Sequence, residues 1–249
     1  DVNIQFRRGE IHGIIGKNGA GKSTLLNILS GILAPSSGQI IVRGVEHARL
    51  NTAKAKREGI TIVTQRPEVV PDFTVVQNLF LPRFIRGRFG FLDWKRMREE
   101  AERIFAEAGL QIDSQRRMRD LSLDEEQIFL LLKAFGVDKK EFILLDEVTT
   151  SFSRKEQEFF YKLIEDQRRK GNLIIFISHR LDEMMRICDR VTVLRDGRAI
   201  GTLEKADLSK DVLARMIVGD KGEKPVEEET RLEAVAAASE PVKKLVLGV

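Results

Sequence analysis

The chain has 249 residues, which is enough for one large domain or two smaller lobes. Hydrophobic residues make up 42% and charged residues 32%, a balance that excludes wholesale disorder. The formal net charge is +4, but the basic residues are spread out and mixed with 38 acids, which argues against a nucleic-acid partner. A single cysteine, Cys188, excludes an internal disulfide and a thiolate zinc site. No window approaches about 18 uninterrupted apolar residues, so we expect no membrane span.

The first sixty residues alternate between apolar runs and helical patterns. Strands are predicted at residues 2–6, 11–15, 39–42 and 60–64, and a helix at residues 22–30. A turn at residues 35–38, rich in Pro, Ser and Gly, precedes the third strand. This alternation is typical of an α/β fold, in which helices flank a mainly parallel sheet.

The character of the chain changes between residues 66 and 135, where amphipathic helices dominate. The clearest of them spans residues 93–108, with Asp93 as N-cap and Gly109 as its C-terminal stop. Core strands are then predicted at residues 142–145, 173–177 and 191–194. We therefore expect a helical subdomain at about residues 66–135, inserted into a domain that spans residues 1–220.

Both ends of the sequence suggest a piece of a longer protein. It opens at Asp1, directly before a strand pattern, and residues 221–240 are rich in Glu, Ala and Lys. Residues 241–249 regain an alternating apolar pattern. We interpret residues 221–249 as a linker and the possible start of a second domain.

One motif carries a strong chemical signal. Residues 16–23 match G-x-x-x-x-G-K-[ST] and lie between a predicted strand and a predicted helix. Glycines let the backbone wrap around phosphates, and the helix N-terminus adds a partial positive charge. Lys22 is expected to reach the β- and γ-phosphates of ATP, and Ser23 to bind Mg²⁺. The predicted ATP-binding residues of this segment are Gly16, Lys17, Asn18, Gly19, Ala20, Gly21, Lys22, Ser23 and Thr24.

Polar residues follow three other predicted strands. Asp146 and Glu147 end one strand, His179 follows the next, and Gln65 follows the strand at residues 60–64. Without other signals, polar residues at the end of a strand often simply face solvent. Beside a phosphate loop, however, parallel strands present their carboxyl ends to one crevice. We expect Asp146 and Gln65 to hold Mg²⁺, Glu147 to activate the attacking water and His179 to contact the γ-phosphate region.

The order of these motifs, with Leu121-Ser122 between Gln65 and Asp146, resembles an ABC ATPase. Segments 176–183 and 189–197 are similar to the first of two tandem cassettes in sugar-type ABC importers. The resemblance implies a P-loop NTPase core with an antiparallel β portion and an inserted α-helical subdomain. It further implies ATP and Mg²⁺ as cofactors, a second ATP-binding cassette in tandem or as a homodimer, and membrane permease subunits. A solute-binding protein would act indirectly, and the location would be peripheral, on the cytoplasmic face of the cell membrane.

The resemblance breaks at the family's signature segment. The family has Leu-Ser-Gly-Gly-Gln or a near variant, which acts in trans on the partner's ATP, whereas this chain has Ser122, Leu123, Asp124 and Glu125 after Leu121. Asp124 replaces a glycine and adds a carboxylate where a triphosphate would lie. We expect the partner's site to be weakened, and this chain's own site to be intact.

Two other functions remain open at this point. A non-hydrolysing regulatory cassette is favoured by the altered signature, but Glu147 and His179 argue against it. A soluble ABC ATPase of DNA repair or translation would need long coiled coils or a distinctive linker, neither of which the sequence contains. An importer subunit for sugars or related small solutes is the preferred interpretation.

Overall fold

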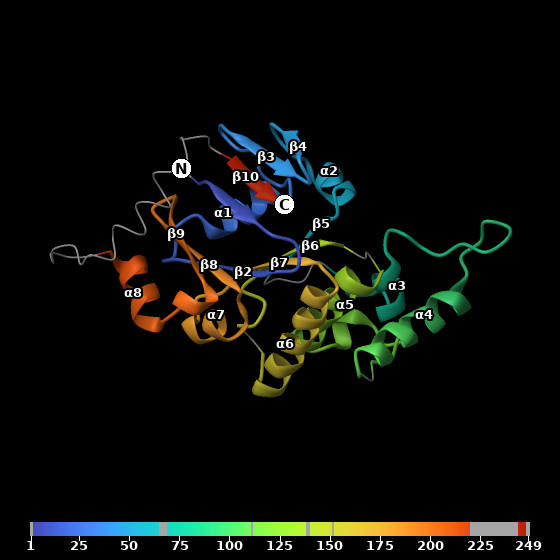
Figure 1. The fold of residues 1–249 in the computed structure, drawn as a ribbon. Coiled ribbons are helices and arrows are strands. Elements are labelled where there is room, and N and C mark those ends of the chain that lie inside the picture. Colours follow the sequence, from blue (N-terminus) through green and yellow to red (C-terminus); the bar gives the residue numbers. More distant parts are fainter. Residues whose placement is uncertain are drawn as a thin grey trace. The chain divides into compact units, whose positions relative to one another are not determined.

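A computed structural model describes residues 2–64, 69–110, 112–137, 140–150, 152–219 and 244–247. The strands are β1 (Ile4–Phe6), β2 (Ile11–Ile15), β3 (Gln39–Val42), β4 (Val45–His47), β5 (Ile60–Val63), β6 (Phe142–Asp146), β7 (Leu173–Ile177), β8 (Arg190–Arg195), β9 (Arg198–Glu204) and β10 (Lys244–Leu247). The helices are α1 (Lys22–Leu29), α2 (Thr52–Arg57), α3 (Val75–Phe80), α4 (Trp94–Glu107), α5 (Leu123–Leu132), α6 (Arg154–Arg169), α7 (Leu181–Ile187) and α8 (Lys210–Val218). Figure 1 shows these elements along the chain.

The contacts divide the chain into two compact units. Unit 1 comprises Asp1–Ile62, Glu141–Glu147 and Ile164–Val249, and unit 2 comprises Val63–Lys140 and Val148–Leu163. Both sheets lie essentially in unit 1, whereas α3, α4 and α5 belong to unit 2. No helix in the described ranges is both long and apolar enough to cross a membrane.

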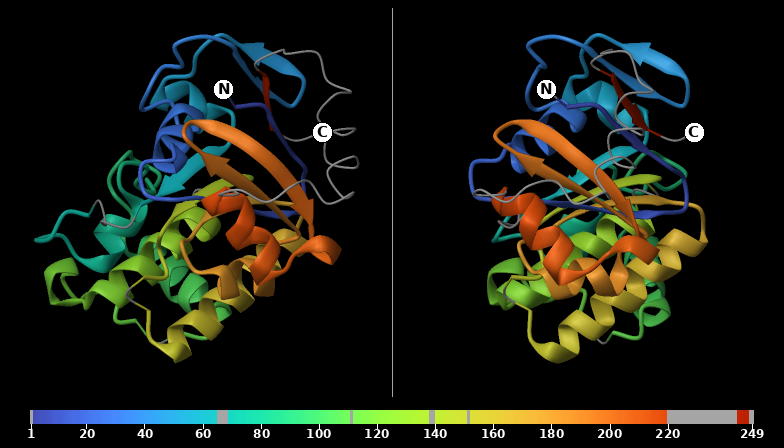
Figure 2. Two further views of the ribbon diagram at one scale, coloured as in Figure 1. Left: turned by 90° about the vertical axis from the view of Figure 1, so that its left-hand side faces the viewer. Right: turned by 60° about the vertical axis from the view of Figure 1, so that its left-hand side comes forward.

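The larger sheet of unit 1 has six strands in the order β5-β6-β7-β2-β8-β9. The pairs β6–β7, β7–β2 and β2–β8 are parallel, and only the hairpin β8–β9 is antiparallel among the pairings whose register the structure gives. α8 packs against β8 and against α7, as Figure 2 shows. The predicted mainly parallel sheet with an antiparallel portion is therefore confirmed.

The smaller sheet has the order β1-β10-β3-β4. β10 pairs in parallel with both β1 and β3, while β3 and β4 form an antiparallel hairpin. The strand within residues 241–249 was expected to open a second domain, and here its backbone lies between two strands of unit 1. The rest of the predicted linker lies outside the described residues, so the domain boundary at residue 220 stays a prediction.

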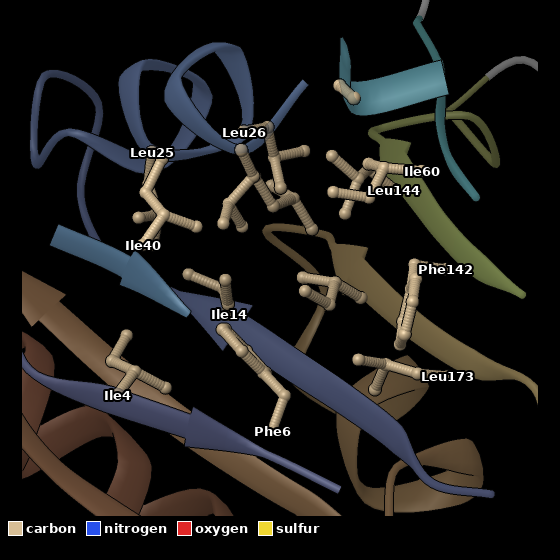
Figure 3. Packing of buried hydrophobic residues seen from close by; sticks show 14 of the residues in the cluster. Ile4, Phe6, Ile14, Leu25, Leu26, Ile40, Ile60, Phe142, Leu144 and Leu173 are labelled. Carbon is tan, nitrogen blue, oxygen red and sulfur yellow. The ribbon is translucent and has the colours of Figure 1, made fainter. Parts of the chain in front are cut away.

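One hydrophobic cluster of unit 1 lies on one face of the six-stranded sheet. Alternate residues of β6 and β7 point to the same side because side chains alternate along a strand. They meet apolar residues of α1 and of the smaller sheet (Figure 3). The residues that Figure 3 labels are Ile4, Phe6, Ile14, Leu25, Leu26, Ile40, Ile60, Phe142, Leu144 and Leu173. α1 is thus fixed directly after β2 by its own buried leucines.

Unit 2 is built from helices with defined ends. α4 buries Met97, Ala101, Ile104 and Phe105, one stripe at helical spacing. Its predicted N-cap is confirmed, because the Asp93 side chain accepts a hydrogen bond from the Arg96 amide at 3.0 Å. Gly109 follows the C-cap with a φ of 70°, the left-handed conformation that glycine adopts without strain.

Candidate nucleotide site

The neighbouring strands β2, β7 and β6 of the six-stranded sheet end at the same level. The register pairs Ile14 of β2 with Ile177 of β7, and Asp146 of β6 with the same Ile177. The loops that leave β2, β6 and β7 therefore start side by side at the carboxyl edge of the sheet. This is the edge at which parallel α/β sheets place their ligands.

Glycines shape the loop that leaves β2. A Cβ atom on Gly16 would lie 2.1 Å from the Leu194 carbonyl oxygen of β8, so no larger residue fits there. Gly21 is the N-cap of α1 and has a φ of 99°, in the left-handed region that favours glycine. It has no side chain that could accept from the first-turn amides of α1. Those amides remain directed at whatever occupies the loop.

The Lys22 side chain is buried within this loop. Its Nζ atom donates to the carbonyl oxygens of Gly16 at 2.9 Å and Lys17 at 3.1 Å. Only 7% of the Lys22 surface is exposed, whereas Lys17, Asn18 and Gly19 are exposed to solvent. A bound phosphate group could replace these two carbonyls as the partner of the ammonium, because a charged acceptor is the stronger one.

Ser23 and Asp146 come together near the Lys22 side chain. Their side chains are hydrogen-bonded, and the Lys22 charge lies near the Asp146 carboxylate. Burial raises the pKa of Asp146 above its usual value, and the Ser23 hydrogen bond offsets only part of this effect. A cation at Asp146 would compensate for that loss of solvation. Thr24 is exposed in the same turn of α1.

This donor set fits a magnesium ion bound together with phosphate. In the described ranges, no group of three or more His, Cys, Asp or Glu side chains is arranged to hold a metal ion. A hydroxyl and one carboxylate leave the remaining positions to water and phosphate oxygens, which is how Mg²⁺ is usually bound. Gln65, the other predicted magnesium ligand, lies outside the described residues.

Glu147 and His179 face each other at the same edge. The His179 Nδ1 atom lies 3.7 Å from Glu147 Oε1, and the two side chains are 54% and 27% exposed, respectively. The Glu147 amide donates to the Ile177 carbonyl at 3.1 Å. The φ angle of Glu147 is 52°, in the left-handed region, which is uncommon for a residue with a side chain. The structure thus brings together an acid and a histidine that were each predicted to lie at this edge of the sheet.

The loop carrying His179 has an anchor that the sequence analysis missed. The buried Ser178 hydroxyl donates to Glu183 Oε2 at 2.6 Å and accepts from the Arg180 amide at 3.1 Å. Arg180 also pairs with Glu183 at 3.0 Å. These contacts bracket His179 on both sides. A glutamate in the first turn of α7 was the available signal, since acids are favoured there by the helix dipole.

The predicted signature residues lie at the start of α5 in unit 2. Ser122 is the N-cap: its hydroxyl accepts from the Glu125 amide at 3.2 Å, and Glu125 Oε2 accepts from the Ser122 amide at 2.8 Å. Arg116 pairs with Glu125 at 3.0 Å. Burial would raise the pKa of Glu125, but the Ser122 and Arg116 hydrogen bonds outweigh it and lower that pKa. This end of the helix satisfies its own donors through a capping box.

The two remaining signature residues differ in their surroundings. Leu123 is 51% exposed. Asp124 lies close to the Glu156 side chain, and the pKa of Glu156 is lowered by Ser153 together with Asp124. Three acids, Asp124, Glu125 and Glu126, occupy the first turn of α5. The expected negative charge in this segment is therefore concentrated at the helix end.

The sequence profile of the ABC transporter family matches residues 1–150, more than half of the chain. The chain belongs to the ABC transporter family. The matched region contains the phosphate loop, the signature segment and the acids that end β6.

Curated relatives extend this likeness beyond residue 150. Ribose import ATP-binding protein RbsA 2 of Burkholderia cenocepacia is 41% identical over 219 residues, which cover 88% of this chain and 43% of that protein. Ribose import ATP-binding protein RbsA 1 of Rhizobium meliloti is 38% identical over 219 residues, with the same coverage of 88% and 43%. A putative ribose/galactose/methyl galactoside import ATP-binding protein of Burkholderia cenocepacia is 42% identical over 217 residues, 87% of this chain and 42% of that protein. The chain spans less than half the length of these relatives.

Solved structures share the fold. A nucleotide-free ATP-binding cassette from an ABC transporter superposes with a TM-score of 0.72 at 22% identity, covering 88% of each chain. A cassette bound to ADP and Pi in a dimeric post-hydrolysis state gives a TM-score of 0.72 at 23% identity, covering 82% of this chain and 89% of the other. The fold is therefore that of an ABC ATP-binding cassette.

Proposed function

We propose that this chain is an ATP-binding and ATP-hydrolysing cassette of an ABC importer for ribose or related sugars. The observation that carries the proposal is the cluster at the carboxyl edge of the sheet. There Lys22 lies within the glycine loop, Ser23 is hydrogen-bonded to Asp146, and Glu147 lies beside His179. The sugar assignment is supported by the names of the relatives, which are ribose or galactose import proteins.

In this proposal the phosphates of ATP bind to the loop at residues 16–24. Lys22 and the first-turn amides of α1 hold the β- and γ-phosphates. Ser23 and Asp146 hold Mg²⁺, with Gln65 as a further ligand. The ion would neutralise charge on the phosphate oxygens during phosphoryl transfer.

Glu147 is the residue that orients the attacking water and takes its proton. Its carboxylate is partly exposed and follows directly after the magnesium ligand, so a water between it and the γ-phosphate is within reach. His179 contacts the γ-phosphate region and is held in place by Ser178 and Glu183. In this proposal, ATP binding in the ground state requires neither Glu147 nor His179.

The proposed partners are a second ATP-binding cassette, in tandem or as a homodimer, and membrane permease subunits. A solute-binding protein acts indirectly, through the permease, and no nucleic acid is involved. The length of the relatives supports a tandem arrangement, since this chain covers only 43% of the first of them. The proposed location is the cytoplasmic face of the cell membrane, peripheral to it.

One substitution tests the proposal. Glu147→Gln should leave ATP binding unchanged and lower turnover by about 10²-fold or more, because a general base contributes about that much. The measurement pairs equilibrium binding of a fluorescent ATP analogue with phosphate release, in the presence of the second cassette. Glu46→Gln, an exposed acid of β4, is the matched control and should change neither quantity.

One alternative retains a specific observation in its favour. The self-capped, acidic start of α5 is compatible with a regulatory cassette that binds ATP without hydrolysing it. Unchanged turnover in the Glu147→Gln protein would favour that alternative, because this chain's own site would then not be the one that hydrolyses ATP. Loss of ATP binding on this substitution would instead contradict the assigned role of Glu147.

A further inference from the structure

A basic and aromatic hairpin separates α3 from α4 in unit 2. Residues 83–92, here called the 83–92 hairpin, are closed by an antiparallel bridge between Arg86 and Leu92. The Gly87 amide donates to the Phe91 carbonyl at 2.9 Å. In Figure 1 this segment extends away from the helices α3 and α4 that it joins.

The tip of the 83–92 hairpin exposes two phenylalanine rings. Phe89 is 83% exposed and Phe91 is 79% exposed, more than any other large hydrophobic side chain in the described part of the chain. Such exposure costs solvation free energy, and two neighbouring rings on one turn are unusual for a surface that faces only water.

The charge of the 83–92 hairpin has one sign. It contains Arg83, Arg86 and Arg88, all exposed, and no acidic residue. The Arg88 guanidinium lies 6.0 Å from the Phe89 ring centroid, and Arg86 donates to the Gly90 carbonyl at 2.7 Å. Cationic groups and aromatic rings are therefore displayed together.

The base of the 83–92 hairpin is held firmly. Phe84 packs edge-on against Trp94, with ring centroids 6.3 Å apart, and the Asp93 amide donates to the Ile85 carbonyl at 2.9 Å. Asp93, which follows the segment in the sequence, is occupied as the N-cap of α4. The tip is thus presented outward by a fixed support.

We propose that the 83–92 hairpin binds the headgroup layer of an anionic lipid membrane. Aromatic rings are favoured at the boundary between headgroups and hydrocarbon, and arginines are attracted to negatively charged headgroups. The inference rests on the proposed function, according to which the chain works at a membrane surface. It adds a direct lipid contact to the contacts made with permease subunits.

The size of the surface favours lipid over a protein partner. A stable protein interface buries about 800 Å² on each side. Two phenylalanine rings bring roughly 400 Å² in total, and they lie on a narrow turn rather than a broad face. A fluid lipid surface needs no complementary shape, so a small cationic and aromatic tip can bind it.

Vesicle sedimentation of the full chain tests this inference. The chain should sediment with vesicles of phosphatidylcholine and phosphatidylglycerol, but not with phosphatidylcholine alone. The double substitution Phe89→Ser/Phe91→Ser should weaken binding about tenfold, and so should Arg83→Gln/Arg86→Gln/Arg88→Gln, which should also remove most of the salt dependence. ATP binding and circular dichroism, measured on the same samples, show that the variants are folded.

Matched controls lie elsewhere on the chain. Ile32→Ser/Leu33→Ser removes two other exposed apolar side chains, and Lys54→Gln/Lys56→Gln/Arg57→Gln removes three charges from α2. Both controls should keep vesicle binding.

Absence of binding to the anionic vesicles, or equal binding by the hairpin variants, would overturn the inference. Hairpin variants that lose only detergent-solubilised permease would overturn it in favour of a protein partner. An unsubstituted chain that binds the anionic vesicles but does not bind ATP would contradict the proposed function and not the lipid contact itself.

Discussion

Two helix N-termini in this molecule have opposite chemistry. α1 starts after Gly21, which has no side chain to cap it, and its first turn contains Lys22 and Ser23 without an acid. α5 starts at Ser122, which forms a capping box with Glu125, and its first turn contains three acids. The first end is open to an anion, and the second has satisfied its amides with its own side chains.

The difference shows how side chains in the first turn decide whether a helix end is open to an anion. A carboxylate three residues after a serine N-cap binds the N-cap amide, as Glu125 does with Ser122. A phosphate at this end would have to displace that carboxylate and would meet the charge of Asp124. In the proposed function, the chain binds its own nucleotide at the first helix end and offers the second to the nucleotide of a partner cassette. Here only the first remains suited to the task.

The largest expected effect comes from removing the cation at the first helix end. Lys22→Ala should lower ATP affinity by about 10²-fold, because truncating one partner of a buried charge pair typically costs 2–5 kcal/mol. Isothermal titration with ATP measures this effect. Lys54→Ala, on α2, is the control and should bind ATP normally. Retained affinity in Lys22→Ala would show that the nucleotide binds elsewhere.

Asp124→Asn should make the two helix ends more alike. Two unit charges 5 Å apart repel by about 3 kcal/mol at an effective dielectric of 20, and screening at an exposed site reduces this severalfold. We therefore expect ATP-dependent association with the second cassette to strengthen about tenfold. Sedimentation velocity in the Glu147→Gln background measures it. Asp124→Glu retains the charge and should bring no gain; a gain with both substitutions would argue against electrostatic repulsion.

Ser122→Ala should open the second helix end without changing its charge. Loss of an N-cap costs about 1 kcal/mol, which corresponds to roughly fivefold faster amide exchange in the first turn of α5. Hydrogen exchange followed by mass spectrometry resolves this helix from the rest of the chain. Ser122→Asn should restore protection, since asparagine also caps helices. Unchanged exchange in Ser122→Ala would mean that Glu125 and Arg116 hold the turn unaided.

The smallest effect concerns Asp146, next to the first helix end. Its folded pKa is raised by burial, so the folded state holds the proton more tightly than the unfolded state. Stability is therefore greatest below the unfolded pKa and declines as pH rises through the folded pKa. Asp146→Asn should raise the stability of the nucleotide-free protein at neutral pH, because a neutral amide avoids the cost of burying the carboxylate charge.

Thermal unfolding from acidic to neutral pH, with and without Mg²⁺ and ATP, measures this change. With ATP present, Mg²⁺ should raise the unfolding temperature of the unsubstituted protein but not that of the Asp146→Asn protein. Asp72→Asn, an exposed acid, should alter neither curve. A destabilised nucleotide-free Asp146→Asn protein would indicate that the Ser23 hydrogen bond outweighs the burial of the carboxylate.

Much of the fold could be predicted because its central strands are continuous apolar runs. The bounds of β2, β3 and β7 match the predicted segments, and β6 extends one residue further, to Asp146. Short or exposed elements such as β4, β9 and α8 were missed, since their patterns are weak. α3, α4 and α5 lie within the predicted helical region, and the first residues of α6 also belong to unit 2.

The sequence by itself determined which residue types the candidate site contains, because a phosphate loop and strand-end acids are local patterns. The tertiary structure decided which of these groups meet. Only the order β6-β7-β2 brings the Ser23 hydroxyl to Asp146 and His179 to Glu147, across more than a hundred residues in the first case. The buried Ser178–Glu183 contact and the raised pKa of Asp146 likewise depend on what surrounds each side chain. Hydrogen bonds between distant strands and loss of solvent are properties of the packed molecule, and no local pattern encodes them.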